Sequence, residues 1–476
     1  MVTKIFRFTL IMIIPIMFAC EKQKEDSPTL VSFDGGRVSQ NDYIAEFLQS
    51  TRNKPNTEPT ADGLKEIITN QAMTQIAVLA AIDARMDEDS LYLEIVRKKV
   101  DQVLLNKYIQ QEIVDKVVTD SLVAKVYAES SPLFRMSLIK RAFSEFSTPE
   151  EIAAQKDTID FISEQLENGG SFQILAKKYS QDFRTAFKGG DLGFMISEAM
   201  DEPNLRKAMR NLNVKGTSKP IRGITGFYII RKGKGINSKV PPFEKVEAKI
   251  RQSVYRLRSI ERKLFAEQRF IEIAGRYAYE ENENNISQLE EKLGSSTKDP
   301  HSKLPPKLKY SNIDMQMELA KFRGGVITVA DVFAVSPKIL ENVNEFKAQL
   351  KNVAQDRVFV LHAREMGMPN DADLAERIQE IETQTLRTIL VQRKITDRTQ
   401  FLFATAGNDT INSLPKNKTR IEEMVRDEFD RTLKEHYNFK FITENFAAAL
   451  VLAREKVDER NNKLKLKSDI PKKQNK

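Results

Sequence analysis

Residues 179–182 read YSQD and residues 188–194 read KGGDLGF, and these two runs decide the fold of the middle of the chain. Asp182 lies seven residues before the first glycine of the second run. Paired glycines supply the backbone freedom that a tight turn needs. Glycines cluster throughout residues 134–235, and this region has the pattern of mixed strand and helix. We interpret GGDLG as a turn within that region and not as a phosphate-binding loop.

The sequence on either side of these runs predicts further elements. Residues 136–143 (MSLIKRAF) have strand character. Thr148, Pro149 and Glu151 then fit the N-cap, N1 and N3 positions of a helix. That helix should end at the Asn-Gly-Gly of residues 168–170. Residues 226–230 (GFYII) close the region as a strand.

The order of these motifs resembles the parvulin family, the PpiC-type or rotamase peptidyl-prolyl isomerases. The resemblance rests on four motifs and covers about 100 of the 476 residues: FQILAKKYSQD, GGDLGF, GTSKP and GFYII. It implies an α+β fold, in which a parvulin domain with a small antiparallel sheet and flanking helices is inserted between helix-rich N- and C-terminal regions. Those regions resemble the SurA- and PrsA-like foldases, though through weaker motifs.

Resemblance to a prolyl isomerase implies a particular chemistry. Such an enzyme lowers a rotation barrier of about 18–20 kcal/mol around an imide bond, without a covalent step, cofactor or metal. By position in the motifs, Asp182 and Tyr228 are the candidate catalytic residues. Asp182 takes the family's Cys/Asp position, and Tyr228 stands where its second histidine belongs. Met200, Leu205 and Thr225 are the candidate substrate-binding residues, the first two as an apolar shelf for the proline ring.

The family histidines are missing from this sequence. The first would lie at Ser137 or close to it, and the three histidines of the chain, His301, His362 and His436, all fall outside the domain. We therefore expect a weak or degenerate isomerase. Simple core packing of the two shelf candidates, and a turn role for the Cys/Asp-position aspartate, remain open alternatives.

The N-terminus has the pattern of a targeting segment. Lys4 and Arg7 precede an apolar run at residues 8–19, which is too short to span a bilayer. Ala19 then stands before Cys20, the one cysteine of the chain, which resembles a bacterial lipobox. We expect cleavage before Cys20, lipidation of its thiol and anchoring to a membrane of the cell envelope. The alternative is an ordinary secretory signal with a chance cysteine.

An internal repeat lies outside the central region. Residues 33–42 (FDGGRVSQND) match residues 322–331 (FRGGVITVAD) without a gap, and both runs lead into helices. Tyr277 and Asn285 match Tyr437 and Asn445 at the same separation. We interpret this as a duplicated structural module that builds a helical framework from both ends of the chain. A common strand–turn–helix entry that arose twice is the alternative.

These patterns divide the chain into six segments. They are a lipoprotein signal peptide (1–20), an N-terminal helical chaperone-like region (21–130), the parvulin-like domain (131–238), a helical region (239–292), a C-terminal helical region with the repeat (293–460) and a basic disordered tail (461–476).

Composition restricts the partners of the chain. The net charge is +8, but 75 basic residues are interleaved with 67 acidic ones, so we expect a solvated helical surface and no nucleic-acid partner. The expected partners are unfolded or proline-containing client polypeptides, together with a membrane that the chain would bind through a lipid anchor at Cys20. The sequence predicts a folding factor; a non-catalytic holdase chaperone and a structural envelope lipoprotein are the alternatives.

Overall fold

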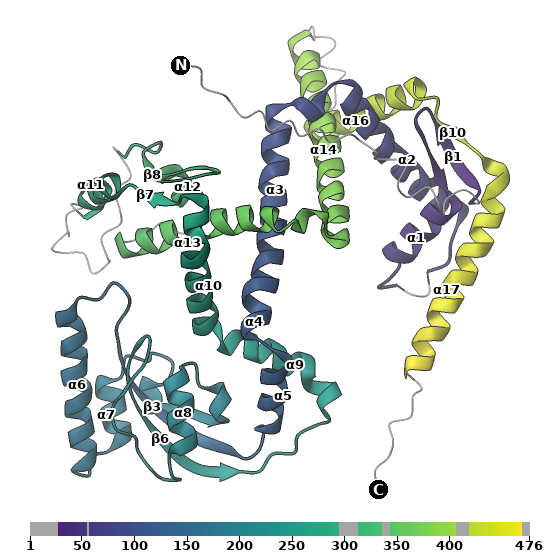
Figure 1. The fold of residues 1–476 in the computed structure, drawn as a ribbon. Helices are drawn as coiled ribbons and strands as arrows, with labels where there is room; N and C mark the ends of the chain where they lie inside the picture. Colours follow the sequence, from purple (N-terminus) through teal and green to yellow (C-terminus); the bar gives the residue numbers. More distant parts are fainter. Residues whose placement is uncertain (1–26, 55–56, 295–312, 336–342, 406–417, 469–476) are drawn as a thin grey trace. The chain divides into compact units, whose positions relative to one another are not determined.

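The computed structural model describes residues 27–54, 57–294, 313–335, 343–405 and 418–468. The chain forms two units (Figure 1). The first unit joins the residues up to Val100 to those from Ala375 onward, and the second contains Asp101–Leu374. Two helices, α3 (Ser90–Tyr108) and α14 (Ala372–Thr405), run from one unit into the other. The units are described separately below.

The second unit contains the central domain and a helical part on either side of it. Its main elements are α4 (Asp115–Val117), α5 (Asp120–Ala128), β3 (Leu133–Ala142), α6 (Pro149–Glu167), α7 (Phe172–Tyr179), β4 (Asp191–Met195), α8 (Pro203–Asn211), β5 (Ile221–Arg222), β6 (Gly226–Ile236), α9 (Phe243–Leu257), α10 (Ser259–Ala274), β7 (Glu280–Glu281), α11 (Glu283–Gly294), β8 (Glu318–Phe322), β9 (Gly325–Thr328), α12 (Val329–Val335) and α13 (Val343–Glu365).

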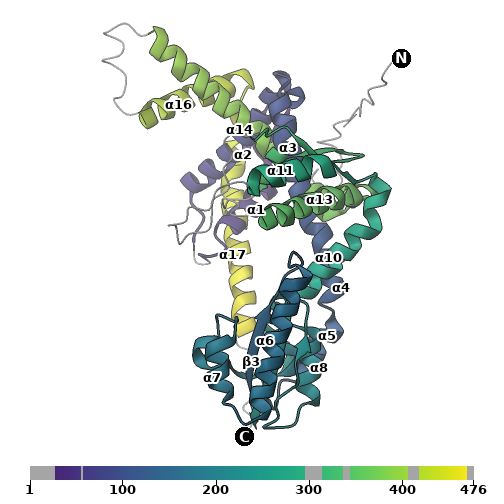
Figure 2. The same cartoon turned by 90° about the vertical axis from the view of Figure 1, so that its left-hand side faces the viewer.

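The central domain is a four-stranded antiparallel sheet in the order β4-β3-β6-β5. Helices α6 and α7 cover one face, where Ile139 and Ile229 pack with Ile159 and Phe172. Helix α8 covers the other face; Figure 2 views the domain from the side of α6, with β3 behind it. The expected α+β class is therefore confirmed, with a sheet-and-helix domain between helical segments.

Local sequence explains how this domain is closed. The capping box predicted at the start of α6 is present, because Thr148 accepts from the Glu151 amide and Glu151 accepts from the Thr148 amide. At the GGDLG turn, Gly190 adopts a φ of +84°, and a Cβ there would lie 2.4 Å from the Leu138 carbonyl oxygen. A side chain would thus push β3 away from the turn that leads into β4.

The first unit is closed by the two ends of the described chain. Its elements, apart from the shared helices, are β1 (Thr29–Phe33), β2 (Gly36–Ser39), α1 (Gln40–Ser50), α2 (Ala61–Asp83), α16 (Lys418–His436), β10 (Lys440–Phe441) and α17 (Phe446–Ser468). Strand β1 pairs with β2 on one side and with β10 on the other. The three-stranded sheet therefore joins residues near 30 to residues near 440.

The second unit repeats this arrangement with β7, β8 and β9. Asp34 donates its amide to the Tyr437 carbonyl at 2.7 Å, and Arg323 donates to the Tyr277 carbonyl at 2.7 Å. The side-chain amide of Asn445 donates to the Thr29 carbonyl at 2.8 Å. Asn285 does the same to the Glu318 carbonyl at 2.8 Å. The same hydrogen bonds in both sheets support the duplicated module over a chance resemblance.

The duplication is longer than the sequence match. Helices α2 and α13 each contain 23 residues. Two positions after the end of each helix, a residue in the left-handed region (Arg85 or Gly367) precedes a short 3₁₀ turn. The tyrosine hydroxyls repeat as well: Tyr437 donates to Asp83 on α2 at 2.6 Å, and Tyr277 donates to Glu365 on α13. Each module thus combines a hairpin, a long helix and a helix–strand–helix segment.

One expectation for the C-terminus is wrong. Helix α17 continues to Ser468, so residues 461–468 are helical, and the expected tail from residue 461 begins too early. Lysine and leucine dominate these residues and favour a helix, and the first proline after them is Pro471. Residues 469–476, residues 295–312 at the start of the expected C-terminal region, and the N-terminal segment with Cys20 lie outside the described residues.

The repeated asparagines allow a matched test of the duplication. Asn445→Ala and Asn285→Ala each leave one strand carbonyl without its donor, so each should lower the free energy of unfolding by about 1–3 kcal/mol. Urea unfolding followed by circular dichroism measures both. Asn106→Ala is the control, because Asn106 is exposed and only accepts from Gln102 on its own helix. A loss in one variant and none in the other would contradict equivalent roles.

Candidate functional site

Three of the five candidate residues belong to the sheet face that α8 covers. Met200, Leu205 and Tyr228 pack with Met136 and Leu138 in one apolar cluster. Strand β6 supplies Tyr228, the segment before α8 supplies Met200, and α8 itself supplies Leu205. The structure therefore brings three of the five predicted site residues into direct packing.

A buried carboxylate organises the polar side of this cluster. Glu202, which is 1% exposed, accepts from the backbone amides of Ile224 at 2.7 Å and Thr225 at 2.9 Å. The hydroxyls of Thr225 and Tyr228 both donate to its Oε1 at 2.8 Å, and these two hydroxyl oxygens lie 2.6 Å apart. Glu202 thus fixes the loop before β6 and two of the predicted site residues together.

The loop approaches Glu202 so closely that it requires a glycine. A Cβ at Gly223 would lie 2.6 Å from the Glu202 Oε2 and 2.6 Å from the Tyr228 ring. No real Cβ tolerates such contacts, so any side chain at this position would displace the carboxylate or the ring. The sequence GIT at residues 223–225 therefore lets the loop approach and donate to the Glu202 carboxylate. Glu202 itself was not among the residues predicted from the sequence.

The charges of this network follow from its contacts. Burial alone would raise the pKa of Glu202, but the hydrogen bonds from Ile224, Thr225 and Tyr228 outweigh it and hold that pKa below the usual range. Burial raises the pKa of Tyr228, and the adjacent Glu202 raises it further. At neutral pH the site therefore contains a carboxylate and a protonated phenol.

Lys140 is the second functional residue that sequence reasoning missed. Its Nζ donates to the Thr225 hydroxyl at 3.0 Å and lies 5.5 Å from the centre of the Tyr228 ring. Burial lowers its pKa, opposed by the charges of Glu202 and Asp182. Its pairing with Tyr228 across β3 and β6 places it at the site.

Asp182 lies in a separate turn network. Its carboxylate accepts from the Thr185 hydroxyl at 2.6 Å and from Arg184 at 3.4 Å, and the side chain is 8% exposed. Arg184 also reaches Asp201 at 3.5 Å. These contacts are those of a turn residue, while the charge of Asp182 still acts on Lys140. Its catalytic role stays a prediction.

The position of the missing first histidine can be assigned by the strand register. Side chains alternate between the two faces of a strand. Met136 and Leu138 pack on the Tyr228 face and Ile139 packs on the opposite face, so Ser137 also belongs to the opposite face. Leu138 is therefore the β3 residue next to Ser137 on the Tyr228 face. It lies opposite Ile230 and offers no polar atom, whereas Lys140 lies opposite Tyr228.

The apolar shelf is closed in this structure. Met200, Leu205 and Tyr228 are each 3% exposed, which is the burial of core residues. In contrast, Phe183 and Phe187, on the loop after α7, are 88% and 65% exposed, and Ile174 on α7 is 66% exposed. The shelf role of Met200 and Leu205 stays a prediction, and the most exposed large apolar side chains of the domain lie on α7 and its following loop.

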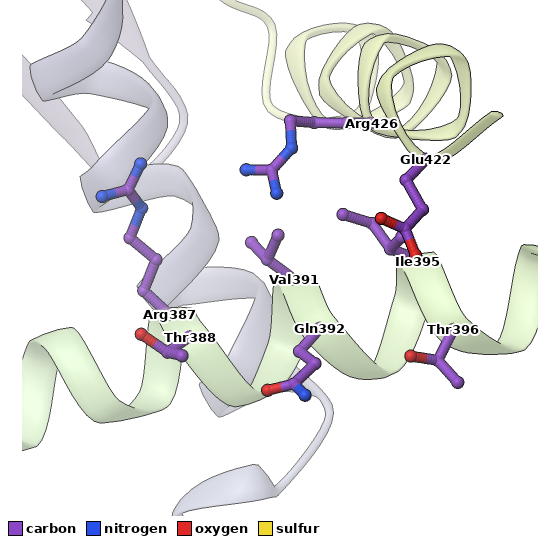
Figure 3. A pocket seen from close by; sticks show the side chains of 8 residues that line it. All are labelled: Arg387, Thr388, Val391, Gln392, Ile395, Thr396, Glu422 and Arg426. Carbon is purple, nitrogen blue, oxygen red and sulfur yellow. The ribbon is translucent and has the colours of Figure 1, made fainter. Parts of the chain in front are cut away.

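A pocket of about 600 Å³ lies in the first unit, between α14 and α16. Val391 and Ile395 of α14 point towards α16, and Arg426 of α16 reaches over them (Figure 3). No predicted site residue lines this pocket. Within the described residues, no three His, Cys, Asp or Glu side chains gather as metal ligands would. None of the described helices combines the length and apolar character of a bilayer span.

Comparison with known proteins places the central domain in a family. The family model described as the PPIC-type PPIASE domain, or rotamase, matches residues 138–234. Foldase protein PrsA 2 of Bacillus cereus is 35% identical over 95 residues, which are 20% of this chain and 32% of that protein. Chaperone SurA of Burkholderia pseudomallei is 40% identical over 81 residues, which are 17% of each chain.

Solved structures of PrsA are among those that match. The crystal structure of PrsA from Bacillus anthracis is 23% identical, with a TM-score of 0.25, and the match covers 49% of this chain and 89% of that one. The sequence matches span about a third or less of the relatives' length. They therefore identify the central domain and leave the function of the whole chain to be argued separately.

The Glu202 network predicts a pH dependence of stability. Since the pKa of Glu202 is lowered on folding, its contribution is fully present above its ordinary value of 4.5 and is lost as pH falls through the folded-state value. Glu202→Gln should cost about 1–3 kcal/mol at pH 7, because the amide replaces a charged acceptor with a donor-bearing group.

Urea unfolding of wild type and Glu202→Gln between pH 7 and pH 3 measures this difference. The two proteins should converge in stability towards pH 3. Glu151→Gln is the control, because Glu151 is an exposed capping residue of the same domain. A constant difference across the whole range would contradict the assignment.

Proposed function

We propose, on the premise that residues 138–234 form a PPIC-type rotamase domain, that the chain is a folding factor of the cell envelope. It binds unfolded, proline-containing segments of secreted or outer-membrane proteins and isomerises their prolyl bonds weakly. The observation that carries this proposal is the rotamase domain, in which Glu202 joins Thr225 and Tyr228, two of the predicted site residues, in one hydrogen-bond network. Similarity to proteins named foldase and chaperone supports the same reading.

Weak catalysis follows from the groups at the site. Polar side chains beside the imide can favour its twisted, less conjugated state. Tyr228 supplies a hydroxyl, but that hydroxyl is already engaged with Glu202 at 2.8 Å, and Lys140, the β3 residue opposite Tyr228, is engaged with the Thr225 hydroxyl at 3.0 Å. A substrate must therefore compete with internal hydrogen bonds and must also open the shelf.

The non-catalytic holdase is the second candidate, and a specific surface favours it. Ile174, Phe183 and Phe187 expose large apolar side chains on consecutive segments of the rotamase domain. Exposed apolar groups of this size are a recognised mark of interaction sites. Unfolded polypeptide would bind there without reaching the closed shelf.

An isomerisation assay on a proline-containing peptide separates the two candidates. The full chain without its signal segment should accelerate relaxation less than about tenfold over an uncatalysed time of tens to hundreds of seconds. Tyr228→Phe should abolish this acceleration and Asp182→Ala should reduce it, whereas Tyr255→Phe, an exposed tyrosine of α9, should not. Acceleration that survives Tyr228→Phe would refute the role of this hydroxyl.

Suppression of client aggregation is measured in parallel. Replacing Phe183 and Phe187 with serine should weaken suppression and leave the stability of the domain unchanged, because both side chains are exposed. Suppression without any isomerisation would establish the holdase. If neither activity is found, the structural envelope lipoprotein is the remaining candidate.

The proposed lipid anchor is tested by Cys20→Ser. Membranes from cells that express the wild-type chain should retain it after a high-salt wash, and mass spectrometry of its N-terminus should show acylated Cys20. The serine variant should be recovered from the soluble envelope fraction. Equal retention of both proteins would refute anchoring through Cys20.

A further inference from the structure

A buried charge network lies on the side of the rotamase domain that meets the helical part of the second unit. Its centre is Glu198, which is 3% exposed and stands two residues before Met200. Arg258, at the junction of α9 and α10 and 4% exposed in its side chain, pairs with the Glu198 carboxylate. The same guanidinium donates to the Glu198 carbonyl oxygen at 3.0 Å. Arg258 of the helical part therefore contacts both the backbone and the side chain of Glu198 in the rotamase domain.

Further charges extend the network in both directions. Arg210 pairs with Glu198, and Lys125 of α5 approaches it at 3.3 Å. Arg206 of α8 pairs with Glu261 of α10, which also lies 3.6 Å from Arg258. Helices α5 and α10 thus contribute charged partners to one segment of the domain.

The segment that these charged residues contact, residues 198–202, contains Met200 and Glu202 of the candidate site. Arg206 donates to the carbonyl oxygens of Met200 at 2.8 Å and Asp201 at 3.2 Å. Glu202 follows directly and accepts from the loop that contains Ile224 and Thr225. Arg258 is therefore hydrogen-bonded to Glu198, the backbone leads from Glu198 to Glu202, and Glu202 accepts from the hydroxyls of Thr225 and Tyr228.

We infer that Arg258 and Glu261 are positioning residues of the rotamase site, so that the helical part of the second unit sets the geometry of Met200, Glu202 and Tyr228. The inference rests on the proposed function and names the residues outside the rotamase domain that hold its site in place.

Physical chemistry favours such a role over a purely stabilising one. Buried ion pairs repay their desolvation only with good geometry, and apolar replacements are often as stable. Burial lowers the pKa of Arg258 to about 10, and the charges of the neighbouring Arg206 and Arg210 act in the same direction. Since this pKa still lies well above neutral pH, the guanidinium remains charged there. Removing the Arg258 guanidinium leaves Glu198 buried with fewer partners. This change directly affects residues 198–202, which contain Met200 and Glu202.

Hydrogen exchange of the full chain without its signal segment tests the inference without any substrate. In Arg258→Met, the amides of Ile224 and Thr225 should exchange about tenfold faster, whereas the Lys232 amide, bonded to Gly216 in the same domain, should stay within about twofold. Arg258→Lys, which keeps the charge but loses the bidentate geometry, should give an intermediate effect.

Arg251→Met is the matched control, because Arg251 lies on α9 and pairs with Asp120 near the surface. It should leave all three amides unchanged. Unchanged exchange at Ile224 and Thr225 in Arg258→Met, or equal acceleration at every amide in both Arg258 variants, would overturn the inference.

A binding measurement separates this inference from the proposed function. Arg258→Met should change the affinity of the domain for a proline-containing peptide by about tenfold or more, whereas Arg251→Met should not. A wild-type chain that binds no such peptide would refute the proposed function, while the exchange result would still decide whether Arg258 positions the loop. Peptide affinity that is identical in wild type and Arg258→Met would overturn the positioning role.

Discussion

A carboxylate that is withdrawn from water must find hydrogen-bond donors, and Glu202 meets this requirement within the rotamase domain itself. Its donors come from one loop and one strand that follow it by more than twenty residues. The requirement explains the glycine at 223 and the inward hydroxyl of Tyr228.

Several features of the fold could be predicted from the sequence because they depend on neighbours along the chain. The capping box at Thr148 and the turn at Gly190 need only local geometry, and both are present. The repeated hairpin was visible because its glycines and capping residues recur at fixed spacing. Extension of the repeat to the long helices was not visible, because helix length and buried contacts tolerate many different side chains.

The site was predictable only in part, for a related reason. Thr225 and Tyr228 were found through their motif, but Glu202 and Lys140 acquire their roles only when distant segments meet. The face on which Leu138 lies depends on the strand register, which the motif does not fix to a single residue. Residues 461–468 were misjudged because high charge alone does not prevent a helix, and the proline that ends such a helix lies farther on.

The order of pairing in the first sheet has a consequence for biogenesis. Strand β1 near residue 30 completes its sheet with β10 near residue 440, so more than 400 residues separate the two partners. A chain that emerges from its N-terminus leaves the edge of β1 that pairs with β10 unpaired until nearly all of the chain has been synthesised. In the second unit, the matching strands β7, β8 and β9 are separated by far fewer residues, so their sheet can form earlier. The rotamase domain therefore completes its own folding while the first unit of the same chain is still waiting for its last strand.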